Sequence, residues 1–325
     1  MTKDISYFID NEERLIPKKK YEEGQIKYVC AFPDYYEYGL PNIGHQTIYR
    51  ECYSHENTIP DRYYLARDSF KRKDITWENT FCVKECDFLG FTISYEGSYI
   101  NILRMLKDCQ IPFRSINRDD TLPLIIAGGP TVMYNPLPLS NFFDAFILGE
   151  GEDVIHSILS VYQRMKGKGR YNILCALSEI KGIFVPFIHK FGDSIDQVPP
   201  VNISNKPAHS IFITKECVYG ERTFTIEIRR GCDQKCRFCY MGTRLRPARI
   251  ISENAFTEKV RNGLKYCKIV KCFYEGLPTN IIERYLSKIN KMGGRIRVGS
   301  QRLEMLSNNL IRMIADSGHG IFKDA

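Results

Sequence analysis

Hydrophobic and polar residues follow a pattern that switches several times between strand-like and helix-like in the first 165 residues. Apolar runs bounded by turn residues predict buried strands at residues 26–34, 87–95, 122–130 and 143–152. Between and after them, residues 98–110 and 152–165 carry apolar side chains at helical spacing. This alternation predicts an α/β domain with a doubly wound parallel sheet, in which ligands bind beyond the carboxyl ends of the strands.

A second alternation begins near residue 223. The pattern predicts strands at 223–231, 268–276 and 294–306, and helices at 252–267 and 280–293. Ser252 is the expected N-cap of the first of these helices. Repeated βα units of a barrel would bring the loops after the strands to one rim.

The length of 325 residues and the 43% hydrophobic content predict two domains. We expect an N-terminal extension at 1–25, a first domain at 26–180, a linker at 181–220 and a second domain at 221–325. No stretch approaches the roughly 20 apolar residues of a membrane span, and the N-terminus lacks the apolar core of a signal peptide. These features predict a cytoplasmic protein with no membrane partner.

The formal net charge of +8 is unevenly distributed. Residues 201–325 hold 23 Lys and Arg against 11 Asp and Glu, or +12, so residues 1–200 carry −4. This asymmetry favours two domains and an anionic partner or substrate, nucleic acid included. A solvated basic face is the alternative interpretation.

Twelve cysteines in a chain of this kind are expected to be thiols or metal ligands, because the cytosol keeps thiols reduced. Five isolated ones are interpreted as small buried hydrophobes: Cys30, Cys52, Cys109, Cys175 and Cys217. Cys232, Cys236 and Cys239 are different, because they fall within eight positions. No fourth cysteine or histidine follows before Cys267, which disfavours structural zinc. Three thiolates on a 4Fe-4S cluster would leave one iron with an open coordination position.

The spacing Cys-x3-Cys-x2-Cys, with Phe238 and Tyr240 flanking the third cysteine, resembles the signature of the radical SAM superfamily. The resemblance implies that the amino and carboxylate groups of S-adenosylmethionine (SAM) chelate the open iron. It also implies that an electron from the reduced cluster cleaves SAM into methionine and a 5′-deoxyadenosyl radical. An electron donor of the flavodoxin or ferredoxin type is the partner expected for this chemistry.

In this superfamily a glycine-rich segment with a glutamate, at the end of the second barrel strand, binds the amino group of SAM. Tyr274, Glu275 and Gly276 are a partial match, and Glu275 is the candidate for the ammonium contact. Tyr240, Ser300 and Arg302 are further candidate SAM residues, with Gln301 between the last two.

Five arginines surround the cysteines: Arg229, Arg230, Arg244, Arg246 and Arg249. Guanidinium groups pair with carboxylates and phosphates, so these arginines are candidates to receive the SAM carboxylate, a phosphate-bearing cofactor or nucleic acid. Offsetting the negative charge of the cluster is an equal alternative.

Residues 32–46 resemble the start of the cobalamin-binding domain that precedes many radical SAM enzymes. The cobalt-ligating form of that domain has the signature Asp-x-His-x-x-Gly, and this chain has Asp34, Tyr36 and Gly39 at those positions. A phenol with a pKa near 10 is a poor metal ligand, so we expect no lower cobalt ligand from Tyr36. His45 nearby is interpreted as a polar surface or core residue.

Further cobalamin contacts are predicted where glycines follow predicted strands, because the missing side chains would let a large cofactor approach the backbone. These candidates are Ser94, Gly128, Gly129, Gly149 and Gly151.

Together these segments resemble an uncharacterised family of cobalamin-domain radical SAM proteins. The resemblance implies a flavodoxin-like, cobalamin-binding domain followed by the first half of a radical SAM (β/α) partial barrel. About six βα units form such a barrel, but only three are predicted here, so we expect a truncated barrel. The chain would be a fragment, the product of a split gene, or a protein whose barrel a further polypeptide completes.

The function predicted from this resemblance is reductive SAM cleavage at a 4Fe-4S cluster, with cobalamin, for radical methylation. Relatives with a cobalamin domain also methylthiolate, cyclise or rearrange their substrates, and these reactions remain alternatives. The alternative is a nucleic-acid-binding protein or partner subunit that has a structural iron-sulfur site and no activity alone.

Overall fold

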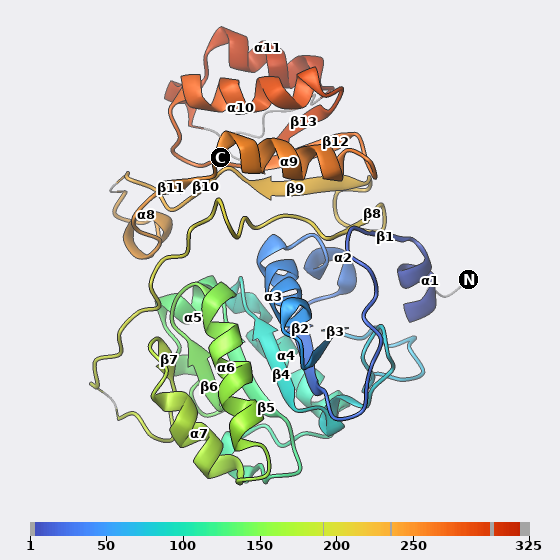
Figure 1. Cartoon of the computed structure of the whole chain (residues 1–325), viewed down its shortest axis with the longest axis vertical. Helices are drawn as coiled ribbons and strands as arrows, with labels where there is room; N and C mark the ends of the chain where they lie inside the picture. Colours follow the sequence, from blue (N-terminus) through green and yellow to red (C-terminus); the bar gives the residue numbers. More distant parts are fainter. Residues whose placement is uncertain (1–3, 191, 235, 300–301, 319–325) are drawn as a thin grey trace. The chain divides into compact units, whose positions relative to one another are not determined.

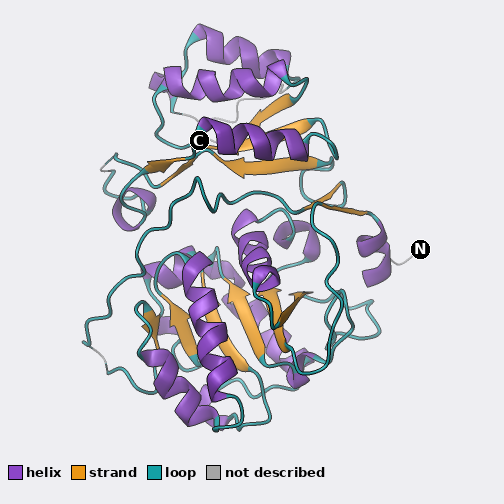
Figure 2. Ribbon diagram, in the orientation of Figure 1, coloured by secondary structure: helices purple, strands orange, loops and turns teal. Residues whose placement is uncertain are grey.

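The structure is a computed structural model that describes residues 4–318, except residues 191, 235, 300 and 301. The chain divides into two compact units. The first contains residues 17–201 and the N-terminal helix, and the second contains residues 11–16 and the chain from residue 202 onward. Each unit combines helices with strands (Figures 1 and 2).

The first unit is built on a six-stranded sheet in the order β3-β2-β4-β5-β6-β7. Its strands are β2 (Ile26–Phe32), β3 (Thr58–Tyr64), β4 (Phe88–Thr92), β5 (Leu124–Gly128), β6 (Ala145–Ile147) and β7 (Ile183–Phe184). All neighbouring strands are parallel except β6 and β7, which pair in antiparallel orientation. The four strands predicted from apolar runs are confirmed, and with them an α/β fold.

Helices pack on this sheet because alternate side chains of its buried strands are apolar on both faces. The helices of this unit are α1 (Ile5–Asp10), α2 (Tyr36–Gly39), α3 (Ile43–Ser54), α4 (Tyr99–Asp108), α5 (Pro130–Tyr134), α6 (Gly151–Met165) and α7 (Arg170–Ser178). Val29 and Phe91 share one core cluster with Ile102 of α4 and Val132 of α5. On the opposite face, Phe88 contacts Tyr162 of α6, with ring centroids 4.7 Å apart.

The pattern analysis missed β3, whose seven residues are all buried. Its centre reads Pro60-Asp61-Arg62, which does not resemble a core strand. The Arg62 side chain is fully buried because Glu78 pairs with it at 2.8 Å. Asp61 accepts hydrogen bonds from Thr76 and from the backbone of Glu78 and Asn79, each 2.8 Å long. Residues that follow in the chain thus satisfy the polar groups of this edge strand, where a proline is tolerated.

The second unit contains a three-stranded parallel sheet in the order β13-β12-β9. Its strands are β1 (Glu12–Arg14), β8 (Phe212–Thr214), β9 (Thr223–Glu227), β10 (Arg229–Arg230), β11 (Arg249–Ile250), β12 (Ile269–Phe273) and β13 (Arg295–Val298). Its helices are α8 (Met241–Arg244), α9 (Glu253–Gly263), α10 (Thr279–Lys291) and α11 (Asn308–Asp316). Two antiparallel pairs, β1 with β8 and β10 with β11, complete the strand pairing described for this unit.

Two predictions for this unit have clear outcomes. Ser252 caps α9 as predicted, because its side chain accepts a hydrogen bond from the Ala255 backbone at 3.3 Å. The strand predicted at 294–306 is wrong in its length, since β13 ends at Val298 and a 3-10 turn occupies Leu303–Met305. The polar run that begins at Gly299 has no apolar face that would continue the strand.

No helix in the described part of the chain is both long and apolar enough to cross a membrane.

Candidate functional site

The three cysteines lie in a loop that begins after β10 and ends at α8, and two glycines allow this loop to close. Gly231 has φ +81°, and a Cβ atom there would lie 1.8 Å from the carbonyl oxygen of Leu245. At Gly242, a Cβ atom would lie 2.2 Å from the carbonyl oxygen of Gln234. Neither position therefore accepts a side chain. The sequence analysis missed these two glycines, although both stand immediately beside the cysteine motif.

The three thiols differ in exposure. Cys232 is buried, whereas Cys236 and Cys239 are half-buried and joined by a turn in which the Cys239 backbone donates to the Cys236 carbonyl at 3.0 Å. Among the described residues, no group of three metal-ligating side chains converges on one point. The donor set nevertheless suits an iron-sulfur cluster chemically, because three thiols occupy one short, glycine-bounded loop.

The loop after β12 lies directly against this cysteine loop. A Cβ atom on Gly276, which has φ +71°, would lie only 2.6 Å from the Cys232 sulfur. The buried guanidinium of Arg229 donates to the Gly276 carbonyl and pairs with Asp233. One arginine thus holds the two segments together, so the structure brings Gly276 and Cys232 into contact.

Glu275 is half-buried beside Gly276, and burial raises the pKa of its carboxyl, while the nearby Lys271 ammonium lowers that pKa by a smaller amount. Its Oε1 atom lies 3.9 Å from the Cβ position of Gly299, the residue that follows β13. The segments that follow the carboxyl ends of β12 and β13 therefore meet at this side chain, as expected for parallel strands.

The remaining SAM candidates in the described part of the chain, Tyr240, Tyr274 and Arg302, lie in different surroundings. Tyr240 begins α8, where its carbonyl accepts hydrogen bonds from the Thr243 and Arg244 backbones. Tyr274 is buried. Arg302 is exposed, and its pKa is raised by the Glu304 carboxylate and, to a smaller extent, by the thiols of Cys236 and Cys232. Ser300 and Gln301 lie outside the described residues.

The other four arginines near the cysteines divide into two kinds. Arg230 pairs with Glu227 at 2.6 Å and is mostly buried. Arg244 and Arg246 are exposed, and Arg249 donates to the Pro247 carbonyl at 3.0 Å. Only the exposed pair keeps its guanidinium groups available to an anion from solution.

In the first unit, the loops after β2 and β4 meet at the carboxyl edge of the sheet. The amide of Asn42 donates to the Ser94 hydroxyl at 3.1 Å, and the amide of Asn101 donates to the Pro33 carbonyl at 3.1 Å. Asp34 follows Pro33 in the first of these loops. Its side chain is half-buried and accepts a hydrogen bond from the Tyr35 backbone. Two predicted cofactor residues, Asp34 and Ser94, thus lie on loops that are tied together.

Tyr36 and Gly39 are buried and pack in the interior of the first unit. The buried Tyr36 ring stacks on Trp77, with centroids 4.8 Å apart and planes 5° from parallel. A Cβ atom on Gly39 would lie 2.7 Å from the Tyr64 ring. His45 is a core residue as well, and burial lowers its pKa to about 3, with a further contribution from Arg62.

At most of the predicted glycine positions of the first unit, protein atoms occupy the space that a side chain would need. A Cβ atom would lie 2.5 Å from the Ile93 carbonyl at Gly129, 2.6 Å from Val198 at Gly149 and 2.6 Å from Ile48 at Gly151. At Gly128 the nearest atom, on Ile147, lies at an ordinary 3.7 Å. These glycines are explained by packing, and by themselves they do not indicate a cofactor.

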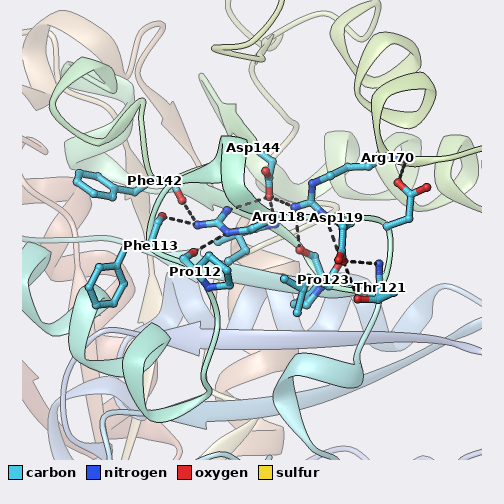
Figure 3. Close-up of polar contacts among 12 residues, drawn as sticks. Pro112, Phe113, Arg118, Asp119, Thr121, Pro123, Phe142, Asp144 and Arg170 are labelled. Carbon is cyan, nitrogen blue, oxygen red and sulfur yellow. Dashed lines mark hydrogen bonds and ion pairs between the residues drawn. The ribbon is translucent and has the colours of Figure 1, made fainter.

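The opposite, amino-terminal edge of this sheet carries a buried polar network (Figure 3) and a cavity of about 280 Å³. Asp87, which precedes β4, and Leu124, at the start of β5, line this cavity together with Arg170. Arg118 and Arg170 both pair with Asp144, at 3.2 and 2.6 Å. Sequence analysis missed this network, because its members are separated by up to 52 positions.

Comparison with known proteins relates this chain to a described family. The family model "Radical SAM proteins, N-terminal" matches residues 44–186. The chain is also 27% identical over 265 residues to an uncharacterized protein, MJ0966, of Methanocaldococcus jannaschii. That alignment covers 78% of this chain and 54% of the relative, so the chain spans about half the length of the curated relative it matches. The family match supports placing the chain in the radical SAM superfamily.

Proposed function

We propose that the protein is a radical SAM enzyme in which Cys232, Cys236 and Cys239 hold a 4Fe-4S cluster and Glu275 receives the ammonium group of SAM. The observation that carries this proposal is the contact of Gly276 with the Cys232 sulfur. Because Glu275 immediately precedes Gly276, the predicted ligand of the SAM ammonium lies next to the residue that touches Cys232, the first predicted cluster ligand. The family match to residues 44–186 supports the radical SAM class of the proposal, although these residues do not include the proposed site.

Each of these residues has a defined task in the proposal. Three thiolates would ligate three irons, which leaves the fourth for SAM. When bound, the reduced cluster supplies the electron that splits SAM into methionine and a 5′-deoxyadenosyl radical. Arg229 is a positioning residue, because it joins Asp233 in the cysteine loop to the Gly276 carbonyl. The ionised Glu275 carboxylate accepts hydrogen bonds from the SAM ammonium, an arrangement stronger than a neutral pair.

The first unit supports a second ligand site at its carboxyl edge. Counted along the chain, its five parallel strands follow the order 2-1-3-4-5 of flavodoxin-like sheets, which bind ligands where the strand order reverses. That point lies between β2 and β4, where the Asn42 to Ser94 hydrogen bond crosses. Cobalt ligation from below does not fit the residues present, because Tyr36 is a buried phenol stacked on Trp77. Cobalamin and radical methylation therefore enter no step of the proposal.

The barrel and the partners belong to the proposal as well. Parallel pairing of β9, β12 and β13 is compatible with the first strands of a (β/α) partial barrel. A flavodoxin or ferredoxin type donor would reduce the cluster. The basic second half keeps a nucleic-acid-binding subunit with a structural cluster as the alternative.

An activity assay separates these functions. The full chain would be reconstituted anaerobically with iron and sulfide, reduced with dithionite and mixed with SAM. We expect 5′-deoxyadenosine from the wild type and about background amounts from Cys236→Ala. A reconstituted protein that binds SAM and iron but forms no 5′-deoxyadenosine would favour the structural-cluster alternative.

A further inference from the structure

The two faces of the three-stranded sheet in the second unit carry different side chains. Side chains alternate between faces along a strand, so Phe224, Val270 and Ile296 point toward α9 and α10, where they are buried. The register pairs Lys271 with Thr225 on one side and with Arg297 on the other. These three residues form one row across the opposite face.

Two cations of this row, Lys271 and Arg297, both lie against the aromatic ring of Tyr219. The Lys271 ammonium lies 4.4 Å from the centroid of the Tyr219 ring and donates to the Tyr219 hydroxyl at 2.8 Å. The Arg297 guanidinium lies 5.3 Å from the same centroid. Neighbouring strands are only about 4.8 Å apart, and like charges at adjacent positions repel. An arrangement of this kind is stabilised when an anion lies between the two cations.

The carboxylates described in this region form no ion pair with Lys271, although its ammonium is near enough to Glu275 to lower the pKa of that carboxyl. Glu221 forms an ion pair with Arg297 and approaches Arg295 at 3.8 Å. Within the described part of the chain, no carboxylate lies within ion-pair distance of the Lys271 ammonium. Phe273, with its centroid 5.0 Å from that ammonium, is the other aromatic contact. Rings and one hydroxyl therefore hold a half-buried cation that has donors to spare.

Lys271 also lies on the strand that leads to the proposed SAM ligand. Lys271 and Phe273 share one face of β12, which ends at Phe273, and Glu275 follows in the turn just beyond that end. Four residues of extended chain span at most about 13 Å between the Cα atoms of Lys271 and Glu275. A molecule held at Lys271 could thus extend toward the carboxyl ends of the strands.

We infer that Lys271, with Arg297 beside it, receives an oxyanion of the substrate, either a carboxylate or a phosphate. The inference rests on the proposed function, because it assigns the substrate class of that same site. Lys271 would act as a specificity-determining residue that anchors the anionic end of the substrate, while the proposed reaction takes place at the strand ends beside Glu275.

Binding of two probe anions by the full reconstituted chain tests this inference. Inorganic pyrophosphate and citrate would be titrated calorimetrically at low ionic strength into the wild type, Lys271→Met and Lys271→Arg. The matched control is Lys265→Met, which removes the same charge at an exposed site where the lysine ammonium donates to the Asn262 side chain at 3.1 Å. We expect Lys271→Met to bind at least about tenfold more weakly, Lys271→Arg to retain most of the affinity and Lys265→Met to match the wild type. Tighter binding of pyrophosphate or of citrate identifies the anion as phosphate or carboxylate.

Three results would overturn the inference: no binding of either probe by the wild type, equal binding by Lys271→Met, or equal weakening in the Lys265→Met control. Thermal melting of each variant detects misfolding, and Lys271→Gln, which is polar but uncharged and is expected to weaken binding as much, replaces Lys271→Met if that variant does not fold. Failure of the proposed function would look different, because the wild type would bind the anion but would not cleave SAM.

Discussion

Two groups of neighbouring cations, one in each unit, differ in how their charges are satisfied. In the first unit, Arg118 donates through all three guanidinium nitrogens, to Asp144 and to the backbone carbonyls of Pro112, Phe113 and Phe142 (Figure 3). In the second unit, Lys271 has one hydrogen bond, to the Tyr219 hydroxyl, and no carboxylate among the described residues. The Arg118 guanidinium is thus fully paired within the protein, whereas the Lys271 ammonium has hydrogen-bond donors left for a ligand.

The difference teaches how to separate structural charges from functional ones. Asp144 is buried, accepts from both Arg118 and Arg170, and also accepts from the Ile125 backbone at 2.6 Å. It therefore fixes the start of β5 and the loops before it. By contrast, the half-buried Lys271 ammonium has no carboxylate partner in the described part of the chain.

The largest expected effect is on stability, at Asp144. Asp144→Ala would leave the buried guanidinium groups of Arg118 and Arg170 without their carboxylate, so we expect a loss of about 3–5 kcal/mol of unfolding free energy. Urea denaturation measures it. The control is Asp68→Ala, because the Asp68 side chain is fully exposed and its pair with Lys73 is at the surface. If Asp144→Ala were as stable as that control, the network would not have the structural role assigned to it.

The next effect concerns the closure of the cysteine loop. In Gly231→Ala, a residue with a Cβ atom would have to adopt the left-handed backbone of Gly231, and that atom would lie 1.8 Å from the Leu245 carbonyl oxygen. We expect this variant to lose about 3 kcal/mol of unfolding free energy and most of the bound iron. Gly220→Ala is the matched control, since Gly220 has φ +67° but no atom within 4 Å of its Cβ position. It should cost about 1 kcal/mol and keep its iron. Equal losses in the two variants would show that the close approach to Leu245 is unimportant.

A smaller effect is predicted for the pH dependence of SAM binding. Burial raises the pKa of Glu275, and only the ionised carboxylate attracts the SAM ammonium. SAM affinity should thus fall as the pH is lowered from neutrality through that raised pKa. Glu275→Gln should bind about tenfold more weakly at neutral pH and show no such decline. Calorimetric titration at several pH values provides the measurement, and an identical pH profile in Glu275→Gln would contradict the proposed contact.

Much of the first unit could be predicted from local pattern, because its strands are continuous apolar runs. β3 could not, since the burial of Arg62 depends on Glu78, which the chain supplies 16 residues later. Tyr36 shows the same limit: nothing near it in the sequence indicates that Trp77 will cover its ring. Distant partners decide both cases, and hydrophobic periodicity contains no information about them.

The candidate site was partly predictable for a different reason. Parallel βα units bring the ends of their strands to one edge, so the meeting of the cysteine loop with the segment around Gly276 follows from the order of elements. The closeness of that meeting depends on Arg229 and on glycines that admit neighbouring backbone, which only coordinates reveal. Lys271 was overlooked because its significance lies in its lateral neighbour, Arg297, on another strand.

The iron content of single-cysteine variants tests the central claim most directly. After anaerobic reconstitution, we predict about four irons per chain for the wild type and for Cys217→Ala, whose half-buried thiol lies outside the loop. Alanine at Cys232, Cys236 or Cys239 should abolish the iron-sulfur absorption or reduce the iron content severely. Wild-type iron content in all three of these variants, or its loss only in Cys217→Ala, would contradict the assignment of the cluster to this loop.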